Sequence, residues 1–79
     1  QPTLRIFPNP STGEFRISLT AAVGPASLRI YDLSGRVVKS EEMELNGGLD
    51  RAFMLKNKGI YIVRLIAGKT NFTERIVVE

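Results

Sequence analysis

The chain has 79 residues, of which 43% are hydrophobic and 24% are charged, and its formal net charge is +3. This length limits it to one small domain, and the mild positive charge permits an anionic partner without requiring one. The sequence contains neither cysteine nor histidine, which excludes disulfides, thiolate zinc sites and catalysis by Cys-His or Ser-His-Asp arrangements within the chain.

Glycine residues divide the sequence into short segments. Apart from the pair at 47 and 48, they recur every nine to twelve residues, which is the spacing of short strands joined by turns. Within the segments, apolar and polar residues alternate with the period of two that a strand with one buried face requires. The pattern predicts strands at residues 4–7, 14–20, 26–32, 36–44, 49–55, 59–67 and 70–78.

The stretch FPNPSTGEF, residues 7–15, follows the first predicted strand and is predicted to be a rigid corner. Pro8 and Pro10 restrict φ and remove two backbone donors, and Gly13 is available for a positive φ in the turn that follows. We also expect Phe7 and Phe15 to close the corner by packing together. The NPS triplet is no glycosylation acceptor because its middle residue is proline, and the stretch lacks the lysine and the following helix of a phosphate-binding loop.

The segment YDLSGRVV, residues 31–38, is predicted to be a tight hairpin between two alternating runs. The Asp32 carboxylate can accept backbone hydrogen bonds from residues two or three positions later, and Gly35 suits the left-handed position of a type I turn with a bulge. A calcium site would need further carboxylates at odd spacings, and only Asp32 is present.

Two later segments complete the prediction in chain order. KSEEMEL, residues 39–45, has helical composition but is too short to form a stable isolated helix, so we expect a polar strand end or a loop, with a single helical turn as the alternative. IYIVRLIAG, residues 60–68, is apolar on both faces. It should be a central strand, covered on one side by the other sheet and on the second side by loops or a partner.

Seven short strands with short connections in a chain of this length predict an all-β fold: a compact seven-stranded antiparallel immunoglobulin-like β-sandwich. We expect residues 1–79 to form a single domain. A chain that starts at Gln1 is expected to be a fragment of a longer protein.

Four motifs carry a resemblance to a known family: PNP-x-x-G at 8–13, LRIYDLSGRVV at 28–38, KGIYIVRL at 58–65 and ERIVV at 74–78. In order and spacing they resemble the type A C-terminal sorting domain of type IX secretion substrates, also called the Por secretion system C-terminal sorting domain. The resemblance runs in register over nearly the whole chain. The family's motif positions fall on Pro8, Asn9, Pro10, Gly13, Tyr31, Asp32, Gly35, Gly59 and Tyr61.

The resemblance implies a small sandwich at the C-terminus of a large exported protein of Gram-negative bacteria. Such a domain directs its upstream cargo through the periplasm and the type IX outer-membrane translocon to the cell surface or the extracellular space. A sortase-like surface peptidase commonly removes it and joins the cargo to anionic lipopolysaccharide, and the cut is expected at or upstream of Gln1. The chain would then be a recognised tag and not an enzyme, with no cofactor and no metal, with only indirect membrane contact, and with homodimerisation left open.

Two hypotheses concern the recognised surface. Arg5, Arg16, Arg29 and Arg64 each alternate with apolar residues, so they would form a basic stripe if their strands shared an exposed face. The end of the last predicted strand, Arg75, Ile76, Val77 and Val78, would offer its backbone edge to a receptor by strand addition.

Other functions fit the sequence less well. A carbohydrate- or adhesion-type sandwich module of an exported enzyme is the main alternative, although the chain has no tryptophan and only six aromatic residues, four Phe and two Tyr. No nucleic-acid partner is expected, because Glu41, Glu42 and Glu44 interrupt the basic sequence and no aromatic residues interleave with the arginines. The glycosylation pattern at Asn71-Phe72-Thr73 is treated as chance.

Overall fold

The computed structural model describes residues 3–79, which form five β-strands. Their bounds are β1 (Leu4–Phe7), β2 (Glu14–Asp32), β3 (Val37–Met54), β4 (Gly59–Ala67) and β5 (Thr70–Val78). All named pairs are antiparallel and belong to one sheet, in the order β1-β2-β4-β5 with β3 on the other side of β2. The predicted all-β antiparallel fold is therefore confirmed. Residues 3–79 contain no helix long and apolar enough to cross a membrane.

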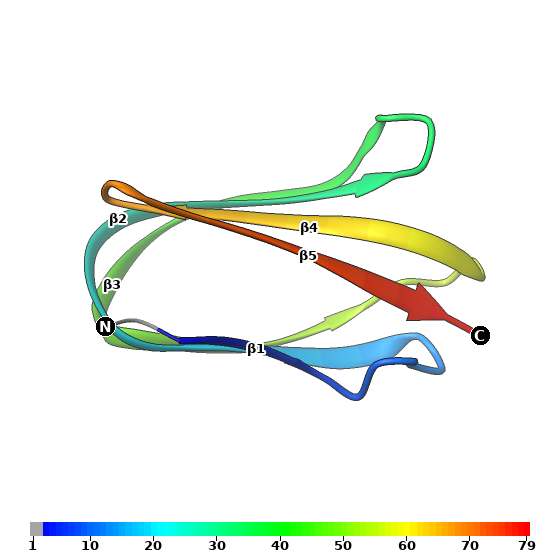
Figure 1. Cartoon of the computed structure of the whole chain (residues 1–79), viewed down its shortest axis with the longest axis horizontal. Helices are drawn as coiled ribbons and strands as arrows, with labels where there is room; N and C mark the ends of the chain where they lie inside the picture. Colours follow the sequence, from blue (N-terminus) through cyan, green and yellow to red (C-terminus); the bar gives the residue numbers. More distant parts are fainter. Residues whose placement is uncertain (1–2) are drawn as a thin grey trace.

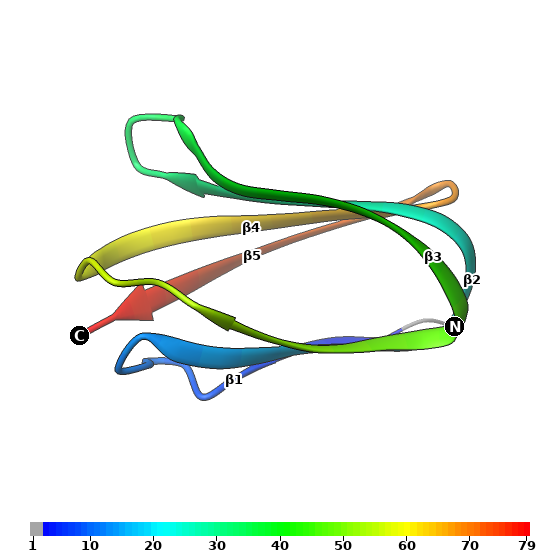
Figure 2. The same cartoon turned by 180° about the vertical axis from the view of Figure 1, so that it is seen from behind.

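The sheet curls because β2 and β3 bend together halfway along their length. Their pairing shifts register between Thr20 and Val23, and Ala21 in this bulge has a φ of 60°. Figures 1 and 2 show the result: β2 and β3 pass from an upper half of the sheet into a lower half, and the two halves face each other. β1 pairs with the lower part of β2, whereas β4 pairs with the upper part.

The bend corrects the predicted strand count and architecture. The predicted strands at 14–20 and 26–32 are the two limbs of β2, and those at 36–44 and 49–55 are the two limbs of β3. Pairing of β2 with β3 resumes beyond the bulge, so the glycines in this region do not end either strand. The count of seven is wrong, and the separate sheets of an immunoglobulin-like sandwich are not confirmed.

The core lies between the two halves of the curled sheet. The alternation predicted its contents correctly: one face of β2, β4 and the lower limb of β3 is buried, and the inward side chains of β1, Leu4 and Ile6, pack against the core. The buried side chains include Phe15, Ile17, Leu19, Leu28, Ile30, Phe53, Val63, Leu65 and Ile76. The rings of Phe15 and Phe53 stack with centroids 6.0 Å apart across paired strands. Burial of each such large side chain contributes about 1.5–3 kcal/mol to folding, so these contacts hold the halves together.

Charged side chains close the core along the edge formed by β3. Glu41 lies opposite Leu28 and Arg51 lies opposite Ile17, so both charged side chains are on the inward-facing side of β3. They form a salt bridge that joins the two limbs of β3. The segment 39–45 is thus strand, and its alternative as a helical turn is wrong. Inward-pointing charges on an edge strand disfavour pairing with a second chain.

Candidate functional site

The corner between β1 and β2 is bonded to the edge of β5. The Asn9 side chain donates from Nδ2 to the Arg75 carbonyl at 2.8 Å and accepts the Val77 N–H at 3.1 Å. Ser11 donates its N–H to the Val77 carbonyl and accepts the Glu79 N–H, both at 2.8 Å. We call these four hydrogen bonds the corner clamp. The clamp satisfies the outer backbone groups of the end of β5 that its pairing with β4 leaves open.

Ser11 and Gly13 hold the corner in the shape that the clamp requires. Ser11 is 2% exposed, and its hydroxyl accepts the Gly13 N–H at 2.9 Å and donates to the Glu14 carbonyl at 2.7 Å. Gly13 has a φ of 125°, and a Cβ at this position would lie 2.9 Å from the Leu55 carbonyl oxygen. Its own carbonyl accepts the Leu55 N–H at 2.8 Å. The glycine of the PNP-x-x-G motif is therefore required by close packing as well as by conformation.

The flanking aromatic residues do not close the corner. Phe15 is 1% exposed and packs in the core on Phe53, whereas Phe7 is 45% exposed and has the Arg5 guanidinium 5.8 Å from its ring centroid. The prediction that Phe7 and Phe15 pack together is wrong, because the two side chains leave the sheet on opposite faces. Pro8 and Pro10 are exposed, and the bonds that precede them are both cis.

The hairpin between β2 and β3 is organised by the Asp32 carboxylate. Its Oδ1 accepts the backbone N–H groups of Ser34 and Arg36, both at 3.0 Å, and its Oδ2 accepts from Arg36 Nε at 3.2 Å. The Ser34 hydroxyl also donates to Oδ1 at 2.6 Å, and this bond is the main cause that lowers the pKa of Asp32 below its ordinary value. The carboxylate is thus a structural acceptor for the turn, which is the role the sequence predicted.

Tyr61 joins β4 to the loop that precedes it. Its ring is buried, and its hydroxyl donates to the Asn57 carbonyl at 2.7 Å. Tyr61 also lies opposite Asp32 on β2 and Ile76 on β5, and Gly59 lies opposite Val78. This register brings three of the motifs together.

The four motifs therefore meet at one end of the molecule. The corner loop, the hairpin at 32–36, the start of β4 and the end of β5 lie at the right-hand end in Figure 1. β1 begins at the other end, where Leu4 lies opposite Leu19 next to the bend. We call the end that carries the motifs the motif end.

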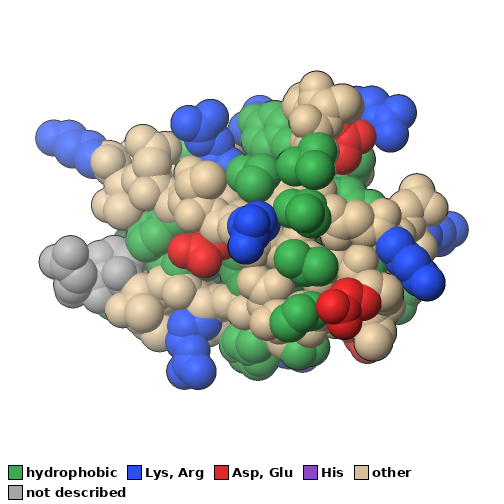
Figure 3. Space-filling model, turned by 45° about the vertical axis from the view of Figure 1, so that its right-hand side comes forward, with side chains coloured by type: hydrophobic (Ala, Val, Ile, Leu, Met, Phe, Trp, Pro, Cys, Tyr) green, Lys and Arg blue, Asp and Glu red, His purple; other side chains and the backbone are tan. Residues whose placement is uncertain are grey.

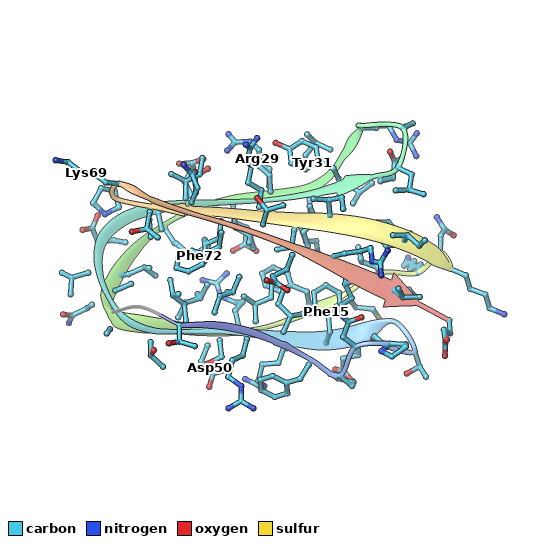
Figure 4. All side chains as sticks on the ribbon, viewed as in Figure 1. Phe15, Arg29, Tyr31, Asp50, Lys69 and Phe72 are labelled. Atoms are coloured by element: carbon cyan, nitrogen blue, oxygen red, sulfur yellow. The ribbon has the colours of Figure 1, made fainter. Side chains whose placement is uncertain are left out.

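The four arginines of the predicted basic stripe lie in two separate groups. Arg5 and Arg16 are on the outer face of the lower half, where Arg16 forms a salt bridge with Asp50 at 2.7 Å. Arg29 and Arg64 lie directly opposite each other on β2 and β4 in the upper half. Figure 4 shows Arg29 and Asp50 pointing outward on opposite sides of the molecule. The structure does not bring the four together on one face.

The end of the last strand is paired on both edges. β4 bonds one edge of β5, and the corner clamp covers the other edge from Arg75 to Glu79. Ile76 and Val78 are buried. Strand addition at residues 75–78 would therefore require the corner clamp to open first.

A groove at the motif end was not predicted from the sequence. It has a volume of about 460 Å³ and lies where the hairpin meets the outer face of β4 and β5, and its lining includes Tyr31, Leu33, Ile62, Arg64 and Thr73. We call it the hairpin groove. The signal that could have located it is the doubly apolar segment 60–68, whose outer face needs a cover. Figure 3 shows hydrophobic side chains at the surface of the molecule with its right-hand side turned forward, with both basic and acidic side chains beside them.

The model of the family described as secretion system C-terminal sorting domain matches residues 5–79. A search of curated proteins finds no match.

Proposed function

The chain belongs to the family of type IX secretion system C-terminal sorting domains, and we propose that it acts as the export label of a larger protein. In this role it directs the cargo that precedes it through the outer-membrane translocon to the surface or the extracellular space. The single observation that supports this most strongly is the family match over residues 5–79, which spans all four motifs.

The position of the motifs also supports a role in recognition. β1 begins at the end of the molecule opposite the motif end, so a cargo joined ahead of β1 would extend away from the corner, the hairpin and the end of β5. A receptor can then reach these features whatever the cargo is. This arrangement suits a label that serves different cargo proteins.

The later steps belong to the same proposal. A sortase-like surface peptidase removes the label at or upstream of Gln1, which lies outside the described residues, and joins the cargo to anionic lipopolysaccharide. The domain itself is the recognised substrate of these machines and carries out no catalysis.

The alternative function, a carbohydrate-binding module, gains no support from the structure. Sugar platforms use exposed aromatic faces, but Phe15, Phe53 and Tyr61 are buried and Phe72 packs against the core. Within residues 3–79, Phe7 is the only exposed aromatic residue. We therefore do not propose it.

A fusion experiment tests the export label. Residues 1–79 are joined behind a secreted reporter with its own inner-membrane signal, in a host that has a type IX system. We expect the reporter at the cell surface or in the medium, and we expect it in the periplasm when residues 5–79 are deleted or when the translocon is inactivated. Equal release with and without the domain would contradict the proposal.

A further inference from the structure

We infer that the hairpin groove docks an extended protein segment that carries both acidic and hydrophobic side chains. The inference rests on the proposed function, because it names the kind of partner that would recognise the label and the face that it would contact. It follows from three features of the outer face of β2, β4 and β5: an uncovered apolar surface, a pair of opposed arginines, and a further exposed arginine on β5.

The apolar surface lies on the central strand of the upper half. Tyr61, Val63 and Leu65 face the core, so Ile60, Ile62 and Ile66 face outward, and Ile66 is 37% exposed. Val77 lies opposite Ile60, and Tyr31 lies opposite Ile62 on the same outer face. Beside them Leu33 at the tip of the hairpin is 69% exposed. Within residues 3–79 no element other than the hairpin rises over this surface.

Two arginines face each other across the strands beside this surface. Arg29 and Arg64 are directly opposite neighbours on β2 and β4, and like charges in that position destabilise a sheet. Arg29 forms a salt bridge with Glu42 at 3.5 Å, but Arg64 forms no salt bridge within residues 3–79. Residue pairs that destabilise a fold are expected at functional sites, where function and not stability determines the residue. The two opposed arginines are such a pair.

The remaining charges on this face leave it basic. Arg75 lies opposite Ile62 and is exposed, and it likewise forms no salt bridge in the described part of the chain. Two carboxylates close to the arginines are already bonded: Glu42 by Ser27 and Arg29, and Asp32 by the turn of the hairpin. Glu74, next to Arg75 on β5, is exposed and forms no salt bridge with Arg64 or Arg75. Arg64 and Arg75 can therefore bind carboxylates from outside.

The spacing of the outer side chains favours an extended peptide as the occupant. Ile60, Ile62, Arg64 and Ile66 alternate along β4, so neighbouring outer positions are about 6.6–6.8 Å apart. The alternate side chains of an extended partner have the same spacing. Apolar side chains can then fill the hairpin groove between Leu33 and Ile62, while acidic ones reach Arg64 and Arg75.

Peptides of defined sequence test the chemistry of the groove. Three twelve-residue peptides are titrated into the isotope-labelled chain 1–79 and followed by NMR: alternating Leu and Glu, alternating Leu and Gln, and alternating Leu and Lys. We expect the Leu-Glu peptide to shift the signals of Tyr31, Ile62 and Thr73, with an affinity about tenfold or more above that of the Leu-Gln peptide. The Leu-Lys peptide should not bind.

A charge reversal at Arg64 and a matched control variant test whether this arginine determines the affinity for the peptide. R64E should weaken the Leu-Glu peptide about tenfold or more, whereas K69E, which changes the net charge equally at the tip between β4 and β5 (Figure 4), should leave the affinity unchanged. Equal binding of the Leu-Glu and Leu-Gln peptides would overturn the inference. Chemical-shift changes centred on Arg16 and Asp50 would also overturn it, because the peptide would then bind the opposite face. The inference would fail as well if phosphatidylglycerol vesicles changed the chemical shift of Ile62 and the Leu-Glu peptide did not.

Export of the reporter fusion provides the second readout. R64E should reduce export without lowering the melting temperature, because the substitution places a carboxylate opposite Arg29 and removes the repulsion between the arginines. K69E should be exported like the parent. If R64E is exported equally, this inference fails and the export label stands; if the parent fusion is not exported, the proposed function fails and the titration alone decides the inference.

Discussion

Asn9 and Val77 are separated by 68 residues in the sequence and are joined by a hydrogen bond of 3.1 Å from the Val77 N–H to Asn9 Oδ1. The same side chain donates to the carbonyl of Arg75. One amide group thus satisfies two backbone groups on the outer edge of β5. This explains why an asparagine, which carries both a donor and an acceptor, stands between the two prolines of the corner.

The substitution N9A removes both of these bonds. We expect it to lower the free energy of unfolding by about 1–3 kcal/mol, because each of the two hydrogen bonds contributes about 0.5–1.5 kcal/mol. Hydrogen exchange should rise at the Val77 amide, measured by NMR, while the amide of Val63 in the central strand changes only by the global amount. Unchanged exchange at Val77 would show that Asn9 does not protect the edge.

Ser11 is expected to matter more than its neighbour Thr12. S11A leaves the buried Gly13 N–H without its acceptor, at a cost of about 1–3 kcal/mol, whereas T12A changes an exposed side chain and should stay within about 0.5 kcal/mol of the parent. Urea denaturation of the two variants measures the difference. Similar midpoints for both would contradict the role assigned to the Ser11 hydroxyl.

Two glycines with positive φ should differ in their tolerance of a methyl group. At Gly35, with φ at 90°, a Cβ meets nothing within 4 Å, whereas at Gly13 it lies 2.9 Å from the Leu55 carbonyl oxygen. G35A should therefore cost only the backbone strain, about 1–2 kcal/mol, while G13A adds a steric clash and should cost about 2–4 kcal/mol. Equal decreases in the melting temperature of G35A and G13A would mean that the backbone at Leu55 moves away from the new Cβ at no cost in stability.

The pH dependence of the hairpin follows from Asp32. Its hydrogen bonds with Ser34, the largest cause, and with Arg36 lower the pKa of Asp32 in the folded state, so the carboxylate stabilises the hairpin above the unfolded pKa of about 3.9. This contribution is lost as the pH falls through the lowered folded value. In an NMR titration we expect the signals of Ser34 and Arg36 to be constant from pH 7 to 5 and to move below about pH 4. D32N should abolish that step, and a step that persists in D32N would assign it to another group.

The alternation of side chains predicted the core well because burial depends on local periodicity. Phe15, Ile17 and Leu19 are buried as expected, and so are Val63 and Leu65. The strand count failed for a different reason. Gly24-Pro25 and Gly47-Gly48 are turn signals in the sequence, but β2 and β3 bend together, and each keeps the other paired on both sides of the bulge.

Only those parts of the candidate site that depend on residues close together in the sequence were predicted. The turn role of Asp32 follows from residues two to four positions away, and the sequence contained it. The partners of the Asn9 side chain and of the Ser11 backbone lie near the other end of the chain, and no local pattern identifies them. The opposed arginines likewise depend on the register between β2 and β4, which alternation alone does not determine.

The link between residues 9–11 and residues 75–79 also has a consequence for biosynthesis. The Asn9 side chain and the Ser11 backbone groups lack their partners on β5 until the ribosome has translated Arg75, Val77 and Glu79. A polypeptide that terminates prematurely before Arg75 keeps an unsatisfied corner and lacks the end of β5. The complete corner clamp can therefore form only after translation has passed Glu79.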